Sequence, residues 1–381
     1  MKFLLIYVPN LRFREFNEQL IYTSFEKVIK LYRGSSPRPI INYVTTDENG
    51  VNWIKIGDMP SAGNKVFSCS EKITKDGSKK SRAVYKGDII LSNSMSFGKP
   101  YILGIDGFIH DGWFVIRDYK KYLDKTYLCQ LLSSDIVQNQ YKSTAAGGVV
   151  KNISSDLVNS VKFHLPSIIE QRKIARFLES IDQRIETQIK IIDDYNSLKM
   201  GIYNCMFKEN YADYKLKQLA YIVKGDQINN DQLLSNGSYY MMNGGTSPSG
   251  YLDSYNVSEN TISISEGGNS CGYVQFNSSP FWSGGHCYTI QNVNSALIEN
   301  KYLYHYLKYK EKEMMNLRIG TGLPNIQKKD LENFTILVPS LLIQRKNLAL
   351  FEMLDEKISI LTEELTNLQK QKKYLLCNMF I

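Results

Sequence analysis

One stretch of sequence occurs twice in this chain, and the repetition restricts the fold more than any other feature. Residues 165–207 return as residues 338–380, which lie 173 residues further on, with no insertion. Eleven residues of the first copy are identical in the second: Pro166, Ser167, Gln171, Arg172, Lys173, Glu179, Asp182, Ile185, Lys199, Met206 and Phe207. We therefore expect two copies of one unit, each ending in this stretch.

Both copies carry apolar residues at alternating steps of four and three. Eight of ten such positions are apolar in each copy, and Lys199 and Lys372 interrupt the pattern at the same step. A repeat of 3.5 residues sustained over this length is typical of a coiled coil, and about 40 residues would form a helix about 60 Å long. We expect the seam between the helices to include Leu178, Ile181, Ile185 and Ile192 of the first copy and Phe351, Leu354, Ile358, Leu361 and Leu365 of the second.

Each long helix would expose an apolar stripe that has to be covered, and the other helix is the nearest cover. An antiparallel pair with a module at each end buries both stripes and gives the monomer a pseudo-two-fold axis. A parallel pair, or helices that pair only with other chains, is the alternative. The expected fold class is α+β, with two similar globular domains joined by two long antiparallel coiled-coil helices.

The segments before each long helix read as mixed modules of short strands and one helix. In the first module we expect entry elements at 11–16 and 25–31, strands at 53–56, 83–85, 89–91, 101–103, 112–116 and 161–165, and a helix at 125–141. In the second we expect strands at 239–242, 261–265, 272–276, 281–282 and 287–290, and a helix at 301–316. The two modules share a plan, and their strand regions differ more than their ends do.

The composition suits a chain with real cores and an anionic partner. Hydrophobic residues make up 43% of the chain, the formal net charge is +8, and 26 residues are tyrosine. A basic protein with many aromatic residues fits a nucleic acid, although many basic proteins bind none. Six cysteines without a C-x-x-C pair favour a reducing compartment. The apolar run at 3–8 is too short for a signal peptide, and we expect a cytoplasmic protein without a membrane span.

Several short motifs of this chain resemble the specificity subunit of type I restriction–modification systems. They are residues 53–58 (WIKIGD), 86–94 (KGDIILSNS) and 98–101 (GKPY) in the first module, and 243–250 (NGGTSPSG) and 262–272 (ISISEGGNSCG) in the second. The Pro-Ser-x-x-x-Gln-Arg-Lys opening of both long helices adds to them. Their order and duplication make the resemblance specific, and it covers essentially the whole chain.

The resemblance implies a non-catalytic subunit that binds double-stranded DNA at a bipartite, asymmetric target. It implies target-recognition domains at 1–155 and 209–328 and helical spacers at 156–208 and 329–381. It also implies two adenine-N6 methyltransferase subunits that use S-adenosylmethionine, and restriction (translocase and nuclease) subunits that use ATP and Mg²⁺; this chain itself would hold no cofactor. One departure from the family pattern is Ile343, where Glu170 and the relatives place an acid, and this implies a weaker second docking edge.

The sequence contains no motif of a methyltransferase catalytic site and no phosphate-binding loop. Glu266-Gly-Gly-Asn269 lacks the Lys-Ser/Thr of such a loop, and Asp355-Glu-Lys357 lies along the expected coiled coil. His286 and Cys287 are adjacent without further ligands, so we predict no metal site. A coiled-coil scaffold with lobes that bind other ligands, and the detached specificity part of a methyltransferase fusion, remain the alternative functions.

We expect lysine and arginine side chains to contact DNA phosphates, and polar loop residues to read base edges. The candidates of the first module are Lys79, Lys80, Arg82, Asn93, Ser94, Ser96, Lys99, Tyr101 and Arg117. Those of the second are Asn243, Thr246, Ser247, Asn269, Ser270, Arg318, Lys328 and Lys329. A solvated loop is the alternative for Lys79 and Lys80, and turn formation is the alternative for the polar residues.

The openings of the two long helices are the candidate docking sites for partner subunits. The residues concerned are Gln171, Arg172, Lys173, Gln344, Arg345 and Lys346. The alternative is that these residues only cap the helix ends.

Overall fold

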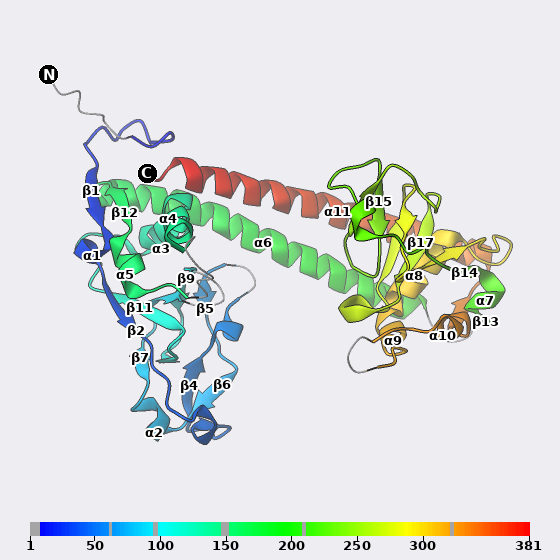
Figure 1. Ribbon diagram of the computed structural model, residues 1–381, viewed down its shortest axis with the longest axis horizontal. Coiled ribbons are helices and arrows are strands. Elements are labelled where there is room, and N and C mark those ends of the chain that lie inside the picture. The colour runs from blue at the N-terminus through cyan, green and yellow to red at the C-terminus, as the bar shows by residue number, and fades with distance from the viewer. Residues whose placement is uncertain (1–7, 61–62, 94–97, 146–151, 208–210, 321–323) are drawn as a thin grey trace. The chain divides into compact units, whose positions relative to one another are not determined.

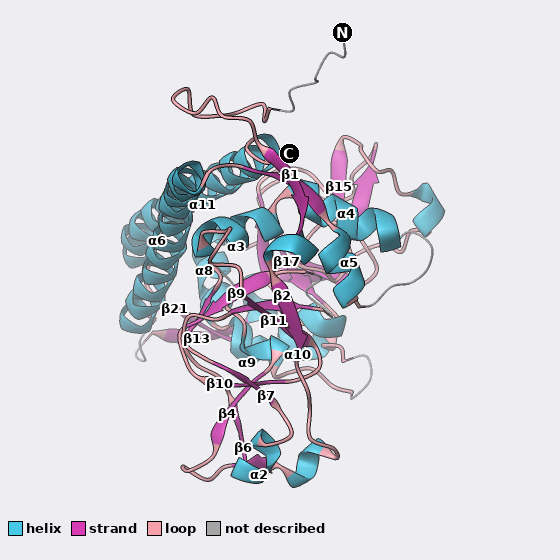
Figure 2. Ribbon diagram, turned by 90° about the vertical axis from the view of Figure 1, so that its left-hand side faces the viewer, coloured by secondary structure: helices cyan, strands magenta, loops and turns pink. Residues whose placement is uncertain are grey.

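The computed structural model describes residues 8–60, 63–93, 98–145, 152–207, 211–320 and 324–381. The chain forms two compact units, unit 1 with residues 1–190 and 362–381, and unit 2 with residues 191–361. Each unit contains one mixed domain of helices and strands together with part of both long helices (Figures 1 and 2). Within the described part of the chain, no helix is both long enough and apolar enough to cross a membrane.

Domain 1, the folded part of unit 1 that precedes the long helices, is built on three sheets. Their strand orders are β3-β6-β4-β10-β7, β2-β11-β8-β9-β5 and β1-β12. The strands are β1 (Ile21–Ser24), β2 (Lys30–Arg33), β3 (Val44–Thr45), β4 (Val51–Ile54), β5 (Lys65–Val66), β6 (Glu71–Ile73), β7 (Arg82–Val84), β8 (Ile89–Ser92), β9 (Pro100–Leu103), β10 (Gly107–Ile109), β11 (Trp113–Arg117) and β12 (Lys162–Leu165). The helices are α1 (Phe25–Val28), α2 (Lys75–Ser78), α3 (Lys125–Ser133), α4 (Asp135–Ala145) and α5 (Ser155–Ser160), with 3₁₀ turns at Ile40–Asn42 and Ile56–Asp58.

Domain 2, the corresponding part of unit 2, is a smaller version of the same plan. Its strand orders are β14-β20-β17-β18, β16-β15-β19 and β13-β21. The strands are β13 (Ala212–Lys215), β14 (Tyr221–Lys224), β15 (Tyr239–Met242), β16 (Gly250–Leu252), β17 (Thr261–Ser265), β18 (Val274–Asn277), β19 (Trp282–Ser283), β20 (Cys287–Gln291) and β21 (Thr335–Val338). The helices are α7 (Leu216–Leu219), α8 (Asn300–Tyr309), α9 (Glu311–Met315) and α10 (Lys328–Glu332), with 3₁₀ turns at Asn230–Gln232 and Gly268–Ser270.

The two long helices are α6 (Ile168–Met206) and α11 (Leu341–Asn378). In unit 1, Asp182 of α6 pairs with Lys372 of α11. In unit 2, Lys199 of α6 pairs with Asp355 of α11. The later α6 residue contacts the earlier α11 residue in both units, since Gln188 bonds to Glu364 in unit 1 and Tyr203 packs on Phe351 in unit 2. The helices therefore run antiparallel within each unit. This confirms the antiparallel expectation.

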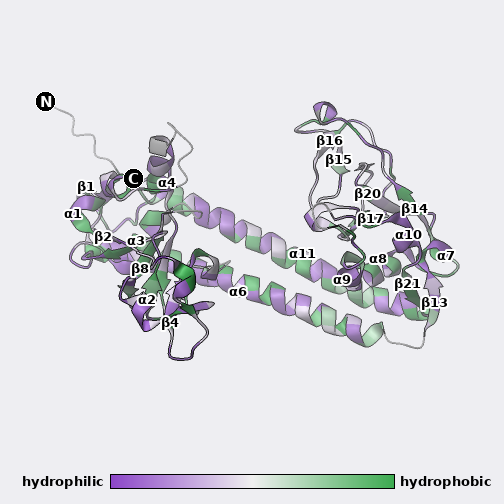
Figure 3. Ribbon diagram, turned by 60° about the horizontal axis from the view of Figure 1, so that its bottom comes forward, coloured by the Kyte–Doolittle hydropathy of each residue, from purple (hydrophilic) through white to green (hydrophobic). Residues whose placement is uncertain are grey.

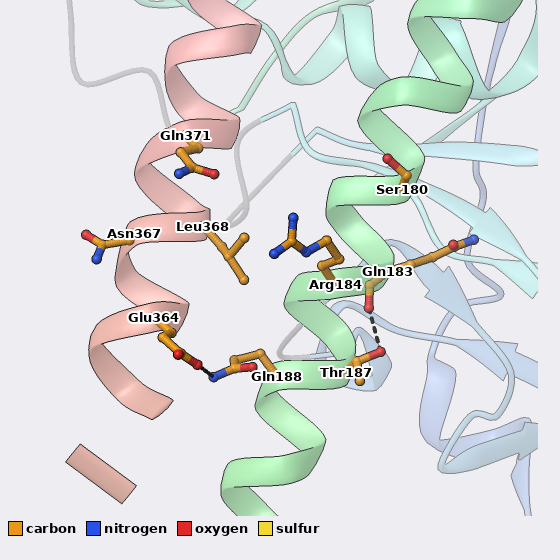
Figure 4. Close-up of a pocket in the computed structure, with 9 residues that line it drawn as sticks. All are labelled: Ser180, Gln183, Arg184, Thr187, Gln188, Glu364, Asn367, Leu368 and Gln371. Atoms are coloured by element: carbon orange, nitrogen blue, oxygen red, sulfur yellow. Dashed lines mark hydrogen bonds between the residues drawn. The ribbon is translucent and has the colours of Figure 1, made fainter. Parts of the chain in front are cut away.

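The lysines that interrupt both apolar repeats are therefore partners of the aspartates that both repeats share. Lys199 and Lys372 occupy equivalent positions, and so do Asp182 and Asp355. Each lysine pairs with the aspartate of the other repeat, in a position where neither side chain is more than 37% exposed. A second polar contact in unit 1 is the hydrogen bond of 3.0 Å from Gln188 to Glu364, in a groove that Arg184 and Leu368 also line (Figure 4).

The residues predicted for the seam are all at least partly covered. Leu178, Phe351, Leu354 and Leu361 are buried, and Ile181, Ile185, Ile192, Ile358 and Leu365 are half-buried. Hydrophilic and hydrophobic residues alternate along both helices (Figure 3). The apolar side chains at the two ends of each helix extend this seam into the domain cores, with Leu178 and Phe380 in the core of domain 1 and Tyr203 and Phe351 in that of domain 2.

A buried glutamine, Gln171 in unit 1 and Gln344 in unit 2, ties each domain to the start of a long helix, and we call each of them a glutamine clamp. The Gln171 side chain accepts a hydrogen bond of 2.9 Å from the Asp124 N–H and donates to the Tyr122 and Pro166 carbonyl oxygens at 2.9 and 3.0 Å. The Gln344 side chain makes the matching bonds in unit 2. It accepts from the Glu299 N–H at 2.8 Å and donates to the Leu297 and Pro339 carbonyl oxygens at 2.9 and 2.8 Å.

Two helices predicted as continuous are each divided in two. The chain expected as one helix at 125–141 forms α3 and α4, because Ser134 takes an extended conformation with ψ 154°. Its hydroxyl donates to the Leu131 carbonyl oxygen, and its buried position lets α4 turn back onto the core. The helix expected at 301–316 forms α8 and α9, which separate at Lys310. Residues 11–16 form no regular element, although they were expected to be an entry element.

The acid at Glu170 is an internal residue and not an exposed docking edge. Its side chain is 2% exposed and accepts two hydrogen bonds of 2.7 Å from the Arg12 guanidinium. Arg12 thereby holds the segment before β1 against α6. The weaker second docking edge expected from Ile343, which is exposed, stays a prediction.

Domain 2 carries a buried histidine where domain 1 carries a glutamine. Gln130 on α3 donates a hydrogen bond of 2.7 Å to Asp182, and His305 on α8 lies 3.9 Å from Asp355. His305 Nδ1 also lies 2.7 Å from the Tyr203 hydroxyl. Burial, followed by the positive charges of Lys199 and Lys301, lowers the pKa of His305 to about 3.

We predict that Gln171→Ala and Gln344→Ala each lower the free energy of unfolding by about 2–3 kcal/mol, because each leaves buried backbone groups without partners. Urea unfolding measures the change. Gln183→Ala is the matched control, since Gln183 is exposed on the same helix as Gln171. Equal effects at Gln171 and Gln183 would contradict the proposed role of the clamp.

We predict that His305 makes the protein less stable as the pH falls from 6.5 towards 3. Its pKa in the folded protein is about 3, below the value of about 6.5 expected after unfolding. The unfolded state therefore binds the proton first, which removes about 2 kcal/mol between pH 6.5 and pH 5. His305→Gln copies domain 1 and should flatten this dependence in urea unfolding measured at both pH values. An unchanged slope in the variant would refute the assignment.

Candidate nucleic-acid interface

The ends of β2 and β8 meet the start of β11 at one edge of domain 1, which we call edge 1. The end of β2 joins the start of β11 through a hydrogen bond of 2.8 Å from the Gly34 N–H to the Trp113 carbonyl oxygen. The end of β8 joins the same turn, because the Asn93 N–H donates to the Gly112 carbonyl oxygen at 3.0 Å. A Cβ on Gly34 would lie 1.9 Å from the His110 carbonyl oxygen, so only glycine fits this close approach.

Asp111 is the centre of edge 1. Its carboxylate accepts hydrogen bonds from the Ser36 hydroxyl at 2.8 Å and from the Arg38 guanidinium at 3.2 Å. Its carbonyl oxygen accepts from the Asn93 amide at 2.8 Å and from Arg33 Nε at 3.3 Å. The bond from Ser36 is the main cause of the lowered pKa of Asp111. The carboxylate thus stays ionised and holds the exposed Arg38 guanidinium, while the Asp111 carbonyl oxygen holds the exposed guanidinium of Arg33.

Arg82 on β7 joins these groups through a hydrogen bond of 3.1 Å from its Nε to the Arg33 carbonyl oxygen. Next to them lies a hollow of about 1230 Å³ whose lining includes Arg38, Trp53 and Lys55. Ile41 on its rim is 80% exposed. Edge 1 therefore combines guanidinium donors, which suit phosphate oxygens or guanine, with an apolar surface that suits a thymine methyl group.

In domain 2 the ends of β14 and β17 meet the start of β20 at the corresponding edge, which we call edge 2. Its backbone hydrogen bonds match those of edge 1. The Gly225 N–H at the end of β14 donates to the Cys287 carbonyl oxygen at 2.9 Å. A Cβ on Gly225 would lie 2.3 Å from the Ser283 carbonyl oxygen, so this position too requires glycine. The Glu266 N–H at the end of β17 donates to the His286 carbonyl oxygen at 2.9 Å.

Glu266 is the centre of edge 2. Its carboxylate accepts hydrogen bonds from Lys224 Nζ at 2.7 Å and from the Tyr288 hydroxyl at 2.9 Å, and His286 Nδ1 lies 3.5 Å away. Burial and then the bond to Glu266 raise the pKa of Tyr288, so its hydroxyl stays protonated and donates. Lys224 and His286 are 51% and 64% exposed, so both can reach a ligand outside the protein.

The two edges differ at one equivalent residue. Asn93 and Glu266 lie 173 residues apart and both are buried. Their carbonyl oxygens accept hydrogen bonds of 2.7 and 2.8 Å from the N–H groups of Ile153 and Ile326, which are also 173 residues apart. The backbone is thus the same, while a neutral amide in domain 1 is replaced by a carboxylate in domain 2.

The structure places part of the predicted set of domain 1 at edge 1. Arg82 and Asn93 lie there, although the Asn93 side chain is used within the protein. Tyr101 is 2% exposed in the core, and exposed Lys99 lies over its ring. Ser94 and Ser96 lie outside the described residues.

Three predicted residues of domain 1 lie elsewhere. Lys79 and Lys80 lie in the turn between α2 and β7, where Lys79 pairs with Asp76 at 2.8 Å and Lys80 lies over the Tyr43 ring. Arg117 is at the opposite end of β11 and pairs with Asp88 at 3.1 Å. A role for these three side chains in DNA contact stays a prediction.

In domain 2, Asn243 lies at edge 2, where its side-chain oxygen accepts a hydrogen bond of 2.9 Å from the His286 N–H. The exposed residues Thr246 and Ser247 follow it in the same loop, and Asn269 and Ser270 belong to the 3₁₀ turn after Glu266. Arg318 is exposed after α9. Lys328 and Lys329 are exposed on α10, and Lys328 pairs with Glu332 at 3.7 Å.

The six residues predicted to bind partners fall into two classes. Gln171 and Gln344 are at most 1% exposed and form the clamps described above, so their side chains offer no surface to another subunit. Arg172, Lys173, Arg345 and Lys346 are exposed. Lys173 pairs with Glu15, and Arg345 pairs with Glu299 at 2.7 Å. Contact of these four residues with a partner remains a prediction.

Sequence reasoning missed Arg33, Arg38, Lys224 and His286. The strand registers make Arg33 and Lys224 equivalent, because Arg33 lies opposite Phe114 and Lys224 opposite Tyr288. Both are followed by the glycine that the edge requires. A basic residue before glycine at the end of the corresponding strand of each repeat was the signal that could have identified them. Among the described residues, no group of three or more His, Cys, Asp or Glu side chains could hold a metal ion.

Comparison with known proteins identifies the family. The family model described as the type I restriction modification DNA specificity domain matches residues 29–193 and 208–370. A putative type I specificity subunit of Mycoplasma pneumoniae is 33% identical over 155 residues, which are 40% of this chain and 41% of that relative. The match thus spans less than half of that protein.

Longer and weaker similarities extend over the rest of the chain. A putative type I restriction enzyme specificity subunit of Methanocaldococcus jannaschii is 24% identical over 375 residues, which cover 89% of this chain and 85% of that relative. The crystal structure of a type I restriction–modification S subunit from M. genitalium has the same fold, with a TM-score of 0.63 and 18% identity over 98% of this chain and 99% of that one. The chain belongs to the family of the type I restriction modification DNA specificity domain, and the family model matches it twice.

Proposed function

We propose that this chain is the sequence-specific DNA-binding subunit of a type I restriction–modification complex. The observation that carries the proposal is the pair of edges with one backbone and different side chains, at Asn93 and at Glu266. A shared frame can present each edge to DNA in the same way, while different donors and acceptors read different bases. The target is then bipartite and asymmetric, with one half-site for each domain.

The proposal assigns no catalysis to this chain. Two methyltransferase subunits that use S-adenosylmethionine would modify the target, and restriction subunits that use ATP and Mg²⁺ would cut it. Exposed apolar residues at the start of both long helices support docking there, since Ile169 is 68% and Leu342 is 80% exposed. Exposed apolar side chains at corresponding places in the two repeats suit two copies of one partner.

We predict that Glu266→Gln and Lys224→Gln change the bases accepted in one half-site and leave the other half-site unchanged. Each variant removes a charge from edge 2, and the loss of one base contact costs about 1–3 kcal/mol of discrimination. The methylome of a host that expresses the variant with its partner methyltransferase measures the change. Lys217→Gln is the matched control, because Lys217 bonds to Asn333 on another part of domain 2. Altered bases in both half-sites would contradict the separate roles of the domains.

We also predict that four residues inserted after Lys190 and after Leu361, where the two units divide, lengthen the unread spacer between the half-sites. The reason is that the long helices would then set the spacing, as a coiled coil of fixed length does. The same methylome assay reads both the half-sites and the spacer. Altered half-sites with an unchanged spacer would exclude this role for the helices. A chain that shows no salt-dependent shift of random duplex DNA would instead be a scaffold with lobes for other ligands.

A further inference from the structure

A second charged surface of unit 1 lies at the opposite end of β8 and β11 from edge 1. It is a groove of about 950 Å³, which we call the basic groove, between the turn before β8, the loop from β11 to α3 and the first turns of α6. Its basic residues are Lys86, Arg117, Lys120, Lys121, Lys125 and Arg172. None of the proposed base contacts involves this end of the domain.

The acidic residues of the basic groove are already used within the protein. Asp88 pairs with Arg117 at 3.1 Å, and Asp118 pairs with Lys30 at 3.6 Å. Asp124 accepts hydrogen bonds from the first N–H groups of α3.

The remaining basic residues of the groove are available to a ligand. These residues are Lys86, Lys120, Lys121, Lys125 and Arg172. All five are exposed, and within the described part of the chain none of them takes part in an ion pair. Among its lining residues the groove therefore carries five positive charges outside ion pairs against the one unpaired carboxylate of Asp124, and the mutual repulsion of these positive charges is unfavourable until an anion binds.

Domain 2 has the same backbone at this place but lacks the unpaired charge, and Arg345, which matches Arg172, pairs with Glu299 at 2.7 Å. The turn before β8 has Gly87 at φ 93°, and the turn before β17 has Asn260 at φ 58°. The loop after β11 begins with Asp118 at φ 57°, and the loop after β20 begins with Asn292 at φ 49°. Both loops end at a residue whose N–H donates a hydrogen bond to a clamp glutamine, Asp124 to Gln171 and Glu299 to Gln344.

The side chains on this common frame differ in charge. Glu259 stands where domain 1 has Lys86, and Gln291 stands where it has Arg117. Residues 292–299, which replace the loop with Lys120 and Lys121, contain no lysine or arginine. The frame thus forms without the basic residues, so folding does not explain their presence in domain 1.

The chemistry of the basic groove suits a row of phosphates better than an acidic protein surface. All four of its uncompensated charges that come from domain 1 are lysines, and lysine is depleted at protein–protein interfaces while arginine is enriched. Lysine ammonium groups are mobile point charges that neutralise a phosphate backbone without reading sequence. Exposed Tyr85 and Tyr122 lie next to the groove, under Arg117 and Lys121 respectively.

We propose that the domain 1 lysines of the basic groove bind the phosphate backbone of the DNA beyond the base pairs that domain 1 reads, while Arg172 at the start of α6 stays with the partner-docking candidates. This inference rests on the proposed function, since it extends the DNA contact of the same chain. Because domain 2 lacks the charge, the extra backbone contact occurs on one side of the target only. The groove adds affinity and salt dependence, and it leaves the recognised bases unchanged.

The test compares two triple variants of the full chain, produced with its partner methyltransferase, in binding to duplexes that contain the target. Lys120→Gln/Lys121→Gln/Lys125→Gln removes three charges from the basic groove. Lys27→Gln/Lys142→Gln/Lys162→Gln removes three charges from exposed positions of unit 1 outside it. Thermal unfolding followed by circular dichroism checks that both variants are folded, and fluorescence anisotropy at several salt concentrations gives affinity and salt slope.

We expect the groove variant to lower the salt slope by about 2–3, as three lost phosphate contacts would. The control variant should match the wild type, and the methylome should show the same target for all three proteins. Shortening the duplex on the side of the half-site that domain 1 reads should remove the difference between the groove variant and the wild type. Shortening the duplex on the side of the other half-site should leave the difference between the two proteins unchanged.

Three results would overturn the inference. The groove variant could keep the wild-type slope, or the control variant could lose as much as the groove variant. The groove variant could also bind DNA normally and lose the methyltransferase on size-exclusion chromatography, which would make the groove a surface for an acidic protein. If the wild type itself binds no duplex, the proposed function fails together with the inference, and the wild-type measurement alone distinguishes that case.

Discussion

The structure depends on covering the apolar stripe of each long helix with the other helix. A helix of this length cannot leave such a stripe in water, and an antiparallel partner covers it along its length. Apolar packing alone tolerates a slide by one heptad. The pairs Asp182–Lys372 and Lys199–Asp355 exclude such a slide, because it would leave a lysine and an aspartate without partners in a partly buried seam. The two pairs therefore favour one register of the helices.

The register of the helices is passed on to the domains through a few fixed contacts. Gln171 and Gln344 bind the backbone at the start of α3 and α8, so each domain is held by hydrogen bonds at the opening of a long helix. The seam residues continue into the domain cores, as Leu178 and Phe351 do. Each edge is therefore built on a frame whose position within its own unit is determined by packing. The side chains on that frame, such as Asn93 and Glu266, are then free to differ.

Much of this architecture was predictable, and the site was less so. The repeat predicted both long helices and the seam, because apolar periodicity and burial are directly linked. It did not predict the break at Ser134, since an isolated serine inside a helical pattern gives no strong signal and the core decides its conformation. Tyr101 was expected at a DNA surface and lies in the core, because a tyrosine in a strand suits either place. Arg33 and Lys224 were missed because strand pairing, which puts them opposite Phe114 of β11 and Tyr288 of β20, is not visible in local sequence.

The sequence alone determined the duplication, the coiled-coil pattern and the family resemblance, since these follow from residue identities at fixed spacing. Only the tertiary structure decided which polar residues are free to act. Gln171 and Glu170 look like surface residues in the sequence, and each is buried because a distant segment supplies its partner. The basic groove likewise arises from three segments that are far apart in the chain. Long-range contacts determine burial and charge compensation, and these two quantities separate a structural side chain from one that can bind a ligand.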